Sequence, residues 1–386
     1  MLKVTIDVTP VDAKPSGVGL YVLSLIKAMS CLEDSESLQL GLAYQPRLKD
    51  WLKGNFDFPK NLKNYQKLYK ITMPVRATNL FMDFLPKPLA NYIENTLEDT
   101  DIFHGTNYTV YPCQKIQNII SIYDLSCIRY PEYVDSVVEQ YTRRLTKCLR
   151  WTDAIITISE SSKQDIVNYL NFPVEKVFVT SLASRYSPDF LNKLNLDQAV
   201  QDYNFDFSKP YLLFVSTIEP RKNIQSIIKA FNWLKHNHKI DHQLILIGKK
   251  GWKYVPIFEA IQASPWQNDI HHLNYLSDEL VALFYSKADV FIYPSHYEGF
   301  GLPVLEAITL GAPVIASNTS SIPEVAGDAA VLINPNDFME LAEAILKVIS
   351  DRQFRQDLIN KGKTRANLFS WENTARKTLE AYRSIS

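Results

Sequence analysis

The amino-acid sequence predicts an α/β protein with two doubly wound parallel-sheet domains that face a central cleft. Short β-branched runs alternate with helix-length amphipathic stretches along most of the chain. Apolar strands separated by helices are typical of parallel sheets that helices cover on both faces. The 386 residues suit two domains better than one, and the alternation weakens across the polar, proline-bounded residues 186–210. Because ligands of such sheets sit outside the carboxyl ends of the strands, we expect the active site in the cleft.

The first domain is expected over residues 1–185, where strand-like runs alternate with helical patterns. Its strands are predicted at 4–8, 101–104, 119–123, 154–159 and 177–180, and its helices at 19–31, 135–151 and 160–170. After a linker at 186–210, the second domain covers 211–368, with strands at 211–217, 243–248, 290–293, 313–316 and 330–333. Helical patterns follow near 222–235, 278–286, 302–310, 338–350 and 353–385. We expect residues 369–386 to form a C-terminal helix that packs back on the first domain.

Composition and charge exclude several classes of protein. The 41 basic and 42 acidic side chains give a net charge of −1, so the chain lacks the basic excess of a nucleic-acid binder. No apolar run reaches the roughly 18–20 residues of a membrane-spanning helix, and the first residues, MLKVTIDVTPVD, form a strand pattern rather than a signal peptide. The four cysteines contain no CxxC pair, which indicates reduced thiols. We therefore expect a cytoplasmic protein.

The segment EGFGLPVLE, residues 298–306, is the strongest chemical motif. It follows a predicted strand and opens a predicted helix, so its two glycines allow a sharp turn close to a ligand. The free N–H groups of Phe300, Gly301 and Leu302 would then face a phosphate from a helix N-terminus. Glu298 and Glu306 flank this site, where carboxylates suit sugar or ribose hydroxyls better than a phosphate. The alternative is a simple turn with a solvated Glu306.

A second motif, STIEPRKN at residues 216–223, follows the first strand of the second domain. Arg221 and Lys222 lie at a helix N-terminus, where their charge opposes the helix dipole. We therefore expect a ligand anion, such as a diphosphate, to satisfy them. The alternative is a solvated cationic pair.

A third, weaker motif is PSGVGLY at residues 15–21, between the first strand and the first helix. It lacks the third glycine of the dinucleotide fingerprint, so Gly17, Val18 and Gly19 form either a simple tight turn or a loop that closes on a ligand phosphate.

Together, the spacing of the two glutamates in EGFGLPVLE and the upstream STIEPRKN resemble glycosyltransferase family 4. The resemblance is specific across residues 211–334 and looser across 1–185, where SGVGLY, DIFHGTNY and the run from SIYDLS to ITISESS fit the same pattern. It implies the GT-B fold, with two Rossmann-like domains, and a retaining reaction on a nucleotide-sugar donor. The EPRKN variant is similar to bacterial surface-polysaccharide mannosyltransferases, many of which use GDP-mannose.

The resemblance also implies roles for individual residues. Arg221 and Lys222 would hold the donor diphosphate, Glu298 the transferred sugar and Glu306 the ribose, while Tyr275 and Leu276 would meet the base through backbone groups. His104 would lie beside the reacting sugar, and Asn107 and Asp124 on the acceptor side. The implied catalytic residues are His104, Arg221, Lys222 and Glu298, and the implied donor-binding residues are Gly17, Val18, Gly19, Arg221, Lys222, Tyr275, Leu276, Glu298, Gly299, Phe300, Gly301, Leu302 and Glu306.

Where many relatives have Gly-Val after the last strand of the first domain, this chain has Ala183-Ser184, so the start of the linker is unaligned.

We therefore expect a retaining hexosyltransferase that moves mannose from GDP-mannose to a saccharide or a lipid-linked saccharide. The alternatives are a UDP-glucose-type transferase, a sugar-nucleotide epimerase or a nucleotide-sugar-binding subunit; a phosphorylase lacks a marked pyridoxal lysine. We expect no cofactor and no metal, because Asp99-Thr-Asp101 matches a DxD metal motif but lies where a helix ends and a strand begins.

Residues 47–76 are basic, with eight lysines or arginines against Asp50 and Asp57, and aromatic residues are interleaved among them. This composition suits either a solvated surface or peripheral contact with the inner face of an anionic membrane. We expect the solvated surface and keep membrane contact as a hypothesis.

Overall fold

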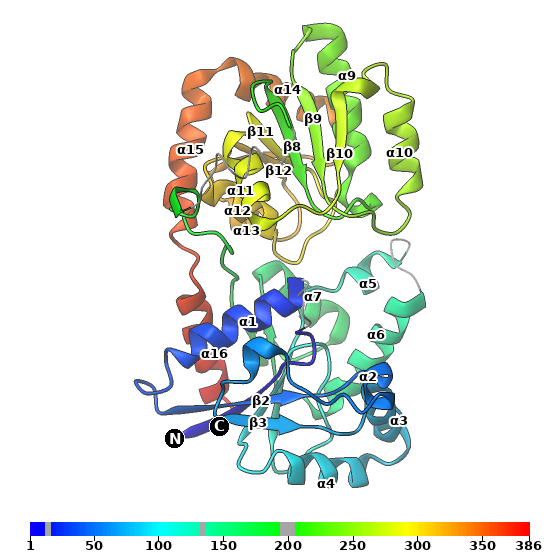
Figure 1. Ribbon diagram of the computed structural model, residues 1–386, viewed down its shortest axis with the longest axis vertical. Coiled ribbons are helices and arrows are strands. Elements are labelled where there is room, and N and C mark those ends of the chain that lie inside the picture. The colour runs from blue at the N-terminus through cyan, green and yellow to red at the C-terminus, as the bar shows by residue number, and fades with distance from the viewer. Residues whose placement is uncertain (12–16, 132–135, 194–204) are drawn as a thin grey trace. The chain divides into compact units, whose positions relative to one another are not determined.

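The structure, a computed structural model, describes residues 1–11, 17–131, 136–193 and 205–386 as two compact units (Figure 1). Among the described residues, unit 1 comprises 1–11, 17–131, 136–182 and 371–386, and unit 2 comprises 183–193 and 205–370. The chain therefore passes from one unit to the other after Leu182 and again after Ser370.

Unit 1 is built on a parallel sheet with the strand order β3-β2-β1-β4-β5-β6-β7. After β1 the chain adds β2 and β3 on one side of β1, and it then adds β4 to β7 on the other side. The strand order therefore reverses between β1 and β4. This is the doubly wound arrangement that the alternation of strands and helices predicts. The strands are β1 (Leu2–Asp7), β2 (Leu38–Tyr44), β3 (Lys67–Lys70), β4 (Ile102–Gly105), β5 (Gln117–Ser121), β6 (Ala154–Thr157) and β7 (Val177–Val179).

Local capping signals bound helix α7 of unit 1. α7 begins after Ser159, whose side chain accepts a hydrogen bond from the Ser162 N–H, and ends at Asn171 in a left-handed conformation. The helices are α1 (Gly17–Ser30), α2 (Leu48–Leu52), α3 (Val75–Phe84), α4 (Pro86–Thr96), α5 (Ser126–Arg129), α6 (Ser136–Cys148), α7 (Glu160–Leu170) and α16 (Trp371–Arg383).

Unit 2 contains a second parallel sheet with the order β10-β9-β8-β11-β12-β13, which reverses between β8 and β11. Its central strands are buried along their whole length, as the sequence YLLFV of β8 requires. The strands are β8 (Tyr211–Val215), β9 (Gln243–Ile247), β10 (Ile270–Leu273), β11 (Val290–Tyr293), β12 (Val314–Ser317) and β13 (Ala330–Ile333).

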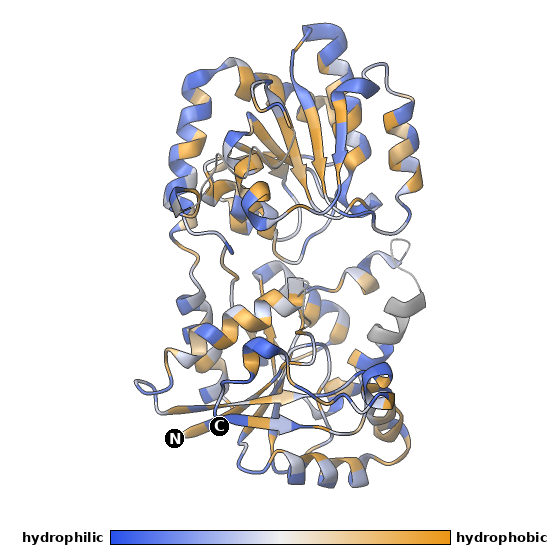
Figure 2. Cartoon of the chain, viewed as in Figure 1, coloured by the Kyte–Doolittle hydropathy of each residue, from blue (hydrophilic) through white to orange (hydrophobic). Residues whose placement is uncertain are grey.

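The helices of unit 2 are amphipathic, and Figure 2 shows hydrophobic strands in this unit beside an α15 that is mostly hydrophilic. They are α9 (Ile224–His238), α10 (Val255–Gln262), α11 (Asp278–Lys287), α12 (Leu302–Thr309), α13 (Ile322–Ala326), α14 (Phe338–Ser350) and α15 (Arg352–Ala366). Across the described residues of both units, none of the helices has the length and apolarity that crossing a bilayer requires.

Each of the ten predicted strands is present, but the prediction missed β2, β3 and β10. β3 and β10 are the sheet edges, and their sequences KLYK and IHHL carry polar residues that break the apolar run. β2 is interrupted by Gly41, where a Cβ atom would come within 2.7 Å of the Tyr69 ring and 2.8 Å of Thr5 Oγ1. This glycine allows close strand packing and conceals the strand from a pattern search.

The prediction of one helix over 353–385 was wrong. α15 ends at Ala366 and α16 begins at Trp371. The two helices belong to different units: α15 packs against α12 in unit 2, where a Cβ atom at Gly362 would lie 3.2 Å from Ile308 Cγ2, whereas α16 packs against α1 in unit 1. No proline or glycine stands between Ala366 and Trp371, so the sequence does not mark the break.

Candidate active site

The two strongest sequence motifs meet in unit 2 at the point where the strand order reverses. STIEPRKN follows β8 and EGFGLPVLE follows β11, and these strands are neighbours in the sheet. The backbone N–H of His296 donates a hydrogen bond of 3.0 Å to the carbonyl of Arg221, which joins the two loops. Such a reversal point, at the carboxyl ends of parallel strands, is where open α/β sheets bind ligands.

Lys222 forms the centre of this cluster. Its side chain is buried, and Nζ lies 2.6 Å from Glu298 Oε1 and 2.9 Å from Tyr293 Oη. Tyr293 in turn stacks on Phe214 of β8, with ring centroids 6.0 Å apart. The lysine is therefore held at a fixed position by a carboxylate and a phenol rather than by solvent.

Arg221 contacts the other oxygen of the Glu298 carboxylate. Its Nη1 lies 3.2 Å from Glu298 Oε2 and donates to the carbonyl of Tyr297 at 2.6 Å, while Nη2 lies 2.8 Å from Glu219 Oε1. Glu219 is buried, with 3% of its surface exposed. Two cations and two carboxylates thus form one compact network at the start of α9.

These contacts shift the ionisation of the network. Burial favours the neutral acid, yet Lys222 and Arg221 outweigh it and hold the pKa of Glu298 at about 2. Burial also lowers the pKa of Lys222, with the attraction of Glu298 opposing that shift. The protein thus supplies Glu298 and Glu219 as counterions for both cations, and the binding of a ligand anion by Arg221 and Lys222 stays a prediction.

The turn after β11 is fixed by backbone geometry and by its neighbours. Gly301 has φ +104°, a conformation that side chains with a Cβ atom disfavour, and a Cβ here would lie 2.6 Å from Ile322 Cδ1. Phe300 is buried edge-to-face against Phe369, at 5.9 Å between ring centroids. α12 then begins at Leu302, whose N–H has no acceptor within the helix, whereas Pro303 has no N–H and the Val304 N–H donates to the Gly301 carbonyl at 2.9 Å.

Glu298 is also held through its backbone. Its N–H donates to Ser320 Oγ at 2.9 Å, and its carbonyl accepts a hydrogen bond from Ser321 Oγ at 2.9 Å. Both serines lie outside the nine-residue motif, so the sequence pattern did not identify them as part of the site. Gly299, within the turn, is buried.

Glu306 has a partner that sequence reasoning missed. Its buried carboxylate lies 2.9 Å from Arg185 Nε, and Oε2 lies 3.4 Å from Tyr285 Oη. Arg185 Nη1 also lies 2.8 Å from Asp278 Oδ1, and the guanidinium sits 4.9 Å from the ring centroid of Tyr186. Burial raises the pKa of Glu306, and Arg185 opposes that shift.

Nothing in the sequence marked Arg185, because it is 121 residues from Glu306 and follows the unaligned Ala183-Ser184. The two residues expected to meet the base differ in exposure: Tyr275 is 81% exposed, whereas Leu276 is buried. Both precede α11, which begins at Asp278.

The remaining predicted site residues lie in unit 1. His104 is fully buried on β4, with Nδ1 2.7 Å from Tyr382 Oη and Nε2 2.8 Å from Ser121 Oγ. Burial lowers its pKa to about 3, so its ring is neutral at physiological pH. Both ring nitrogens therefore have hydrogen-bond partners within unit 1, one of them Tyr382 of α16, and the His104 side chain is not exposed on the surface of the unit.

The two residues expected on the acceptor side lie at the carboxyl edge of the same sheet. Asn107 follows β4 and its carbonyl accepts from Arg144 Nη2 at 3.2 Å; Asp124 follows β5 and accepts from the Ser126 N–H at 2.9 Å. Both residues line a hollow of about 160 Å³. Gly17, Val18 and Gly19 form the first turn of α1, and Pro15 and Ser16 of their motif lie outside the described residues.

The acids of the DxD segment have structural partners. Asp99 pairs with Lys3 at 3.2 Å and Lys67 at 3.3 Å, and Asp101 Oδ2 accepts from the Lys3 N–H at 2.8 Å. In the basic segment, Asp57 lies within 3.8 Å of both Lys63 and Lys70. Part of the positive charge of that segment is therefore neutralised locally.

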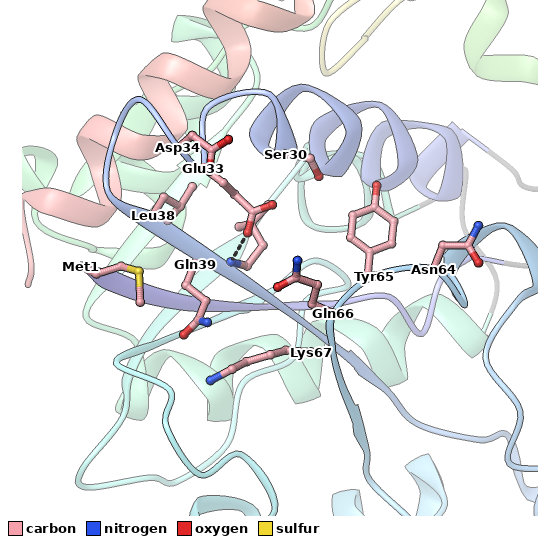
Figure 3. A pocket seen from close by; sticks show the side chains of 11 residues that line it. Met1, Ser30, Glu33, Asp34, Leu38, Gln39, Asn64, Tyr65, Gln66 and Lys67 are labelled. Atoms are coloured by element: carbon pink, nitrogen blue, oxygen red, sulfur yellow. Dashed lines mark hydrogen bonds between the residues drawn. The ribbon is translucent and has the colours of Figure 1, made fainter.

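A hollow of about 500 Å³ lies at the opposite, amino edge of the sheet of unit 1. In Figure 3 the Glu33 side chain points to the backbone, where its carboxylate accepts a hydrogen bond of 2.9 Å from the Leu40 N–H. Lys67 opens β3 at this same edge. Because doubly wound sheets bind ligands at the carboxyl edge, this hollow is not a candidate for the active site.

Comparison with known proteins identifies relatives along the chain. Residues 197–365 match the family of glycosyl transferases group 1. The chain is 28% identical to O-antigen chain mannosyltransferase B of Escherichia coli, with 100% of both proteins aligned. It is also 28% identical to the serotype-specific mannosyltransferase WbdA of Escherichia coli, where the match covers 72% of this chain and 35% of that protein.

Solved structures show the same architecture. Sucrose-phosphate synthase from Thermosynechococcus elongatus superposes with a TM-score of 0.73 at 19% identity, covering 100% of this chain and 99% of that one. Anabaena Alr3699/HepE, solved with UDP and glucose, gives a TM-score of 0.71 at 17% identity and covers 100% of both chains. At these identities the likeness establishes the fold, which is the GT-B arrangement of two Rossmann-like domains expected from the sequence.

Proposed function

We propose that this chain moves mannose from GDP-mannose to a saccharide or a lipid-linked saccharide, since residues 197–365 match the family of glycosyl transferases group 1. The observation that carries the proposal is the pairing of Arg221 and Lys222 with Glu298 where the strand order of unit 2 reverses. The choice of mannose rests on the full-length similarity to an O-antigen chain mannosyltransferase. UDP-glucose is the alternative donor, favoured by the likeness to a fold solved with UDP and glucose.

In the proposed reaction, the donor diphosphate lies beside Arg221, Lys222 and the first turn of α12. As the bond from the sugar to the diphosphate breaks, these groups stabilise the negative charge that develops on the leaving group. The acceptor hydroxyl attacks on the same face, its proton passes to the departing diphosphate, and the anomeric configuration is retained. A donor in this position shares both cations with Glu298, which remains ionised because its pKa is about 2.

We propose further that the reaction needs no metal. Two protein cations and a helix N-terminus supply positive charge at the leaving group, and the acids of the DxD segment are engaged with Lys3 and Lys67 in unit 1. Glu306 is assigned to the ribose, where hydroxyls would hydrogen-bond a carboxylate that Arg185 and Tyr285 position.

The test begins with thermal unfolding of the full chain in the presence of GDP, UDP, ADP or TDP. A ligand at about 100 times its Kd stabilises by about 2.7 kcal/mol, which is readily measured. A selective response to GDP supports the mannosyl donor, and a selective response to UDP supports the alternative. A folded protein that responds to none of them contradicts the proposed donor site.

Transfer is then measured with radiolabelled GDP-mannose and saccharide acceptors, with and without EDTA. We expect an α-linked product from the α-linked donor, at the same rate in both conditions. A β-linked product would contradict retention, and loss of activity that Mg²⁺ or Mn²⁺ restores would contradict metal independence.

Peripheral membrane contact through residues 47–76 is a separate part of the proposal. In α2, Trp51 is 40% exposed and Leu52 is 70% exposed, beside the exposed Lys49 and Lys53. Exposed apolar side chains next to lysines suit an anionic bilayer surface. Under this hypothesis the protein floats with anionic but not with neutral liposomes, and Leu52→Asp floats less; binding to neither liposome would contradict the contact and favour the solvated surface.

A further inference from the structure

The hollow of about 500 Å³ at the amino edge of unit 1 lies where two strands of the sheet separate (Figure 3). β3 pairs with β2 only from Gly41 onward, because the register joins Gly41 to Lys67. The first residues of β2, Leu38 to Leu40, therefore have no β3 residue beside them, and the residues before Lys67 border the opening instead. Glu33, which follows α1, covers part of this strand edge, since its carboxylate accepts the Leu40 N–H at 2.9 Å. The hollow is thus formed by the register of two strands.

Three side-chain amides line this hollow, those of Gln39, Asn64 and Gln66. Each amide carries two N–H donors and a carbonyl acceptor. Within the described ranges none of the three side chains is hydrogen-bonded to another residue, and the dashed hydrogen bond in Figure 3 joins Glu33 to the backbone instead. Amides with unused donors and acceptors suit the hydroxyls of a sugar, because one amide can donate to one hydroxyl and accept from the next.

The lining also offers apolar surface. Leu38 and Leu40 are buried, and Tyr65 is half-buried between Asn64 and Gln66 in the chain. Figure 3 shows the Tyr65 side chain extending toward the end of α1. A sugar ring has an apolar face of C–H groups and a rim of hydroxyls, so an aromatic ring beside amides matches both. The volume of about 500 Å³ suits one or two sugar rings.

The charge of the lining argues against a phosphate ligand. Glu33 and Asp34 are acids, and Lys67 is the one cationic side chain among the described residues that line the hollow. Lys67 Nζ lies 3.3 Å from Asp99 Oδ2, so a carboxylate already balances its charge. Ser30, at the carboxyl end of α1, also lines the hollow, and the helix dipole places partial negative charge there. The ligand that fits this lining is therefore neutral.

We propose that this hollow is a second saccharide site that binds neutral hexose units, with hydroxyls on the three amides and a sugar face on Tyr65. It lies at the amino edge of the sheet, whereas doubly wound sheets hold reacting ligands at the carboxyl edge, so a sugar bound here takes no part in the transfer itself. The proposal rests on the proposed transferase function only for the source of the sugars, which are units of the extended glycan away from its reacting end.

Hydrogen–deuterium exchange of the full chain, read by mass spectrometry, locates the binding site. The probes are mannotriose, which is a neutral saccharide, and inorganic phosphate, which tests the argument from charge. We expect mannotriose to slow exchange in residues 30–40 and 64–67, the two segments that line the hollow. Phosphate is expected to leave exchange in both segments unchanged.

The variant is Tyr65→Ala with Gln66→Ala, which removes the aromatic face and one amide. The matched control is Tyr169→Ala with Asn61→Ala, an exposed tyrosine and an exposed amide of unit 1 that do not line the hollow. We expect the variant to raise the mannotriose concentration for half-maximal protection on the order of 10-fold to 100-fold, through the lost ring contact and hydrogen bonds. The control is expected to respond like the wild type.

The outcomes decide the proposal directly. Protection of both segments by mannotriose that the variant loses and the control keeps supports the saccharide site. No protection of these segments, equal protection in variant and wild type, or protection by phosphate alone overturns it.

Thermal unfolding with GDP separates this proposal from the donor site. We expect the variant with Tyr65→Ala and Gln66→Ala to unfold at the wild-type temperature and to show the wild-type response to GDP, because neither residue belongs to unit 2. A wild-type protein that mannotriose protects yet that ignores every nucleotide contradicts the donor site and leaves the saccharide site standing. A normal nucleotide response without that protection contradicts the saccharide site alone.

Discussion

Replacing Lys222 by methionine removes one of the two cations assigned to the leaving diphosphate and retains an unbranched apolar stem. In the structure, Lys222 Nζ contacts Glu298 Oε1 at 2.6 Å and Tyr293 Oη at 2.9 Å, within a buried network. The variant therefore tests both the chemistry and the packing of the same side chain.

The two effects have different expected sizes. Removing one preorganised stabiliser of transition-state charge costs about 2.7–4 kcal/mol, so we expect turnover to fall about 10²–10³-fold. Breaking a buried ion pair costs about 3–5 kcal/mol when the partner is left unpaired. Here Arg221 Nη1 remains 3.2 Å from Glu298 Oε2, so we expect a smaller loss in the free energy of unfolding, about 1–3 kcal/mol.

The assay is turnover of GDP-mannose per folded molecule, with the free energy of unfolding measured by urea titration on the same preparations. Lys229→Met is the matched control, because Lys229 lies on α9 but is exposed to solvent. We expect the control to retain wild-type turnover. Wild-type turnover in folded Lys222→Met protein would refute the assignment of this lysine to the leaving group.

Four other predictions follow from the contacts described above. Glu306→Ala should weaken GDP binding about 10-fold or more through the lost ribose hydrogen bonds; an unchanged Kd in isothermal titration would argue against the ribose role. Gly301→Ala should lower the free energy of unfolding by about 1–3 kcal/mol, because φ is +104° there, whereas Gly17→Ala, where a Cβ meets no atom within 4 Å, serves as the control in urea titration. Since His104 is neutral in the folded protein with a pKa of about 3, the unfolded chain binds the extra proton, and stability should fall as pH drops from 6.5 toward 3; His104→Gln should flatten that decline. Tyr382→Phe should cost about 1–3 kcal/mol by leaving Nδ1 of the buried His104 ring without a partner, and an unchanged urea midpoint would contradict this contact.

Local patterns in the sequence predicted the central strands because those strands are buried on both faces. The run YLLFV of β8 is apolar at every position, and such runs identify a parallel sheet without knowledge of its neighbours. The edge strands β3 and β10 were not predicted because they are not fully buried. Their sequences KLYK and IHHL mix polar with apolar residues, and part of each strand faces solvent.

The candidate site was predicted in its residues but not in its contacts. The resemblance to glycosyltransferase family 4 implied that Arg221, Lys222 and Glu298 act at one site, and in the structure they lie 2.6–3.2 Å apart. The protein counterions of the two cations were not predicted, because the position of Arg221 and Lys222 at a helix N-terminus says nothing about acids that other segments bring close. Glu298 follows a different strand, β11, so the sequence around Arg221 and Lys222 does not show that its carboxylate balances their charge.

The sequence by itself determined the α/β class, the alternation of strands and helices, and the residue types of the motifs, because burial and backbone conformation impose local periodicity. Only the tertiary structure decided that Arg185 holds Glu306 from 121 positions away, and that Tyr382 of α16 closes on His104 from 278 positions away. The hollow at the amino edge of unit 1 likewise exists only because the register of β2 and β3 leaves Leu38 to Leu40 without β3 residues beside them. The physical reason is that pairing of charges and shaping of a cavity depend on which strands become neighbours, and that order is set by the packing of the whole unit rather than by any one segment.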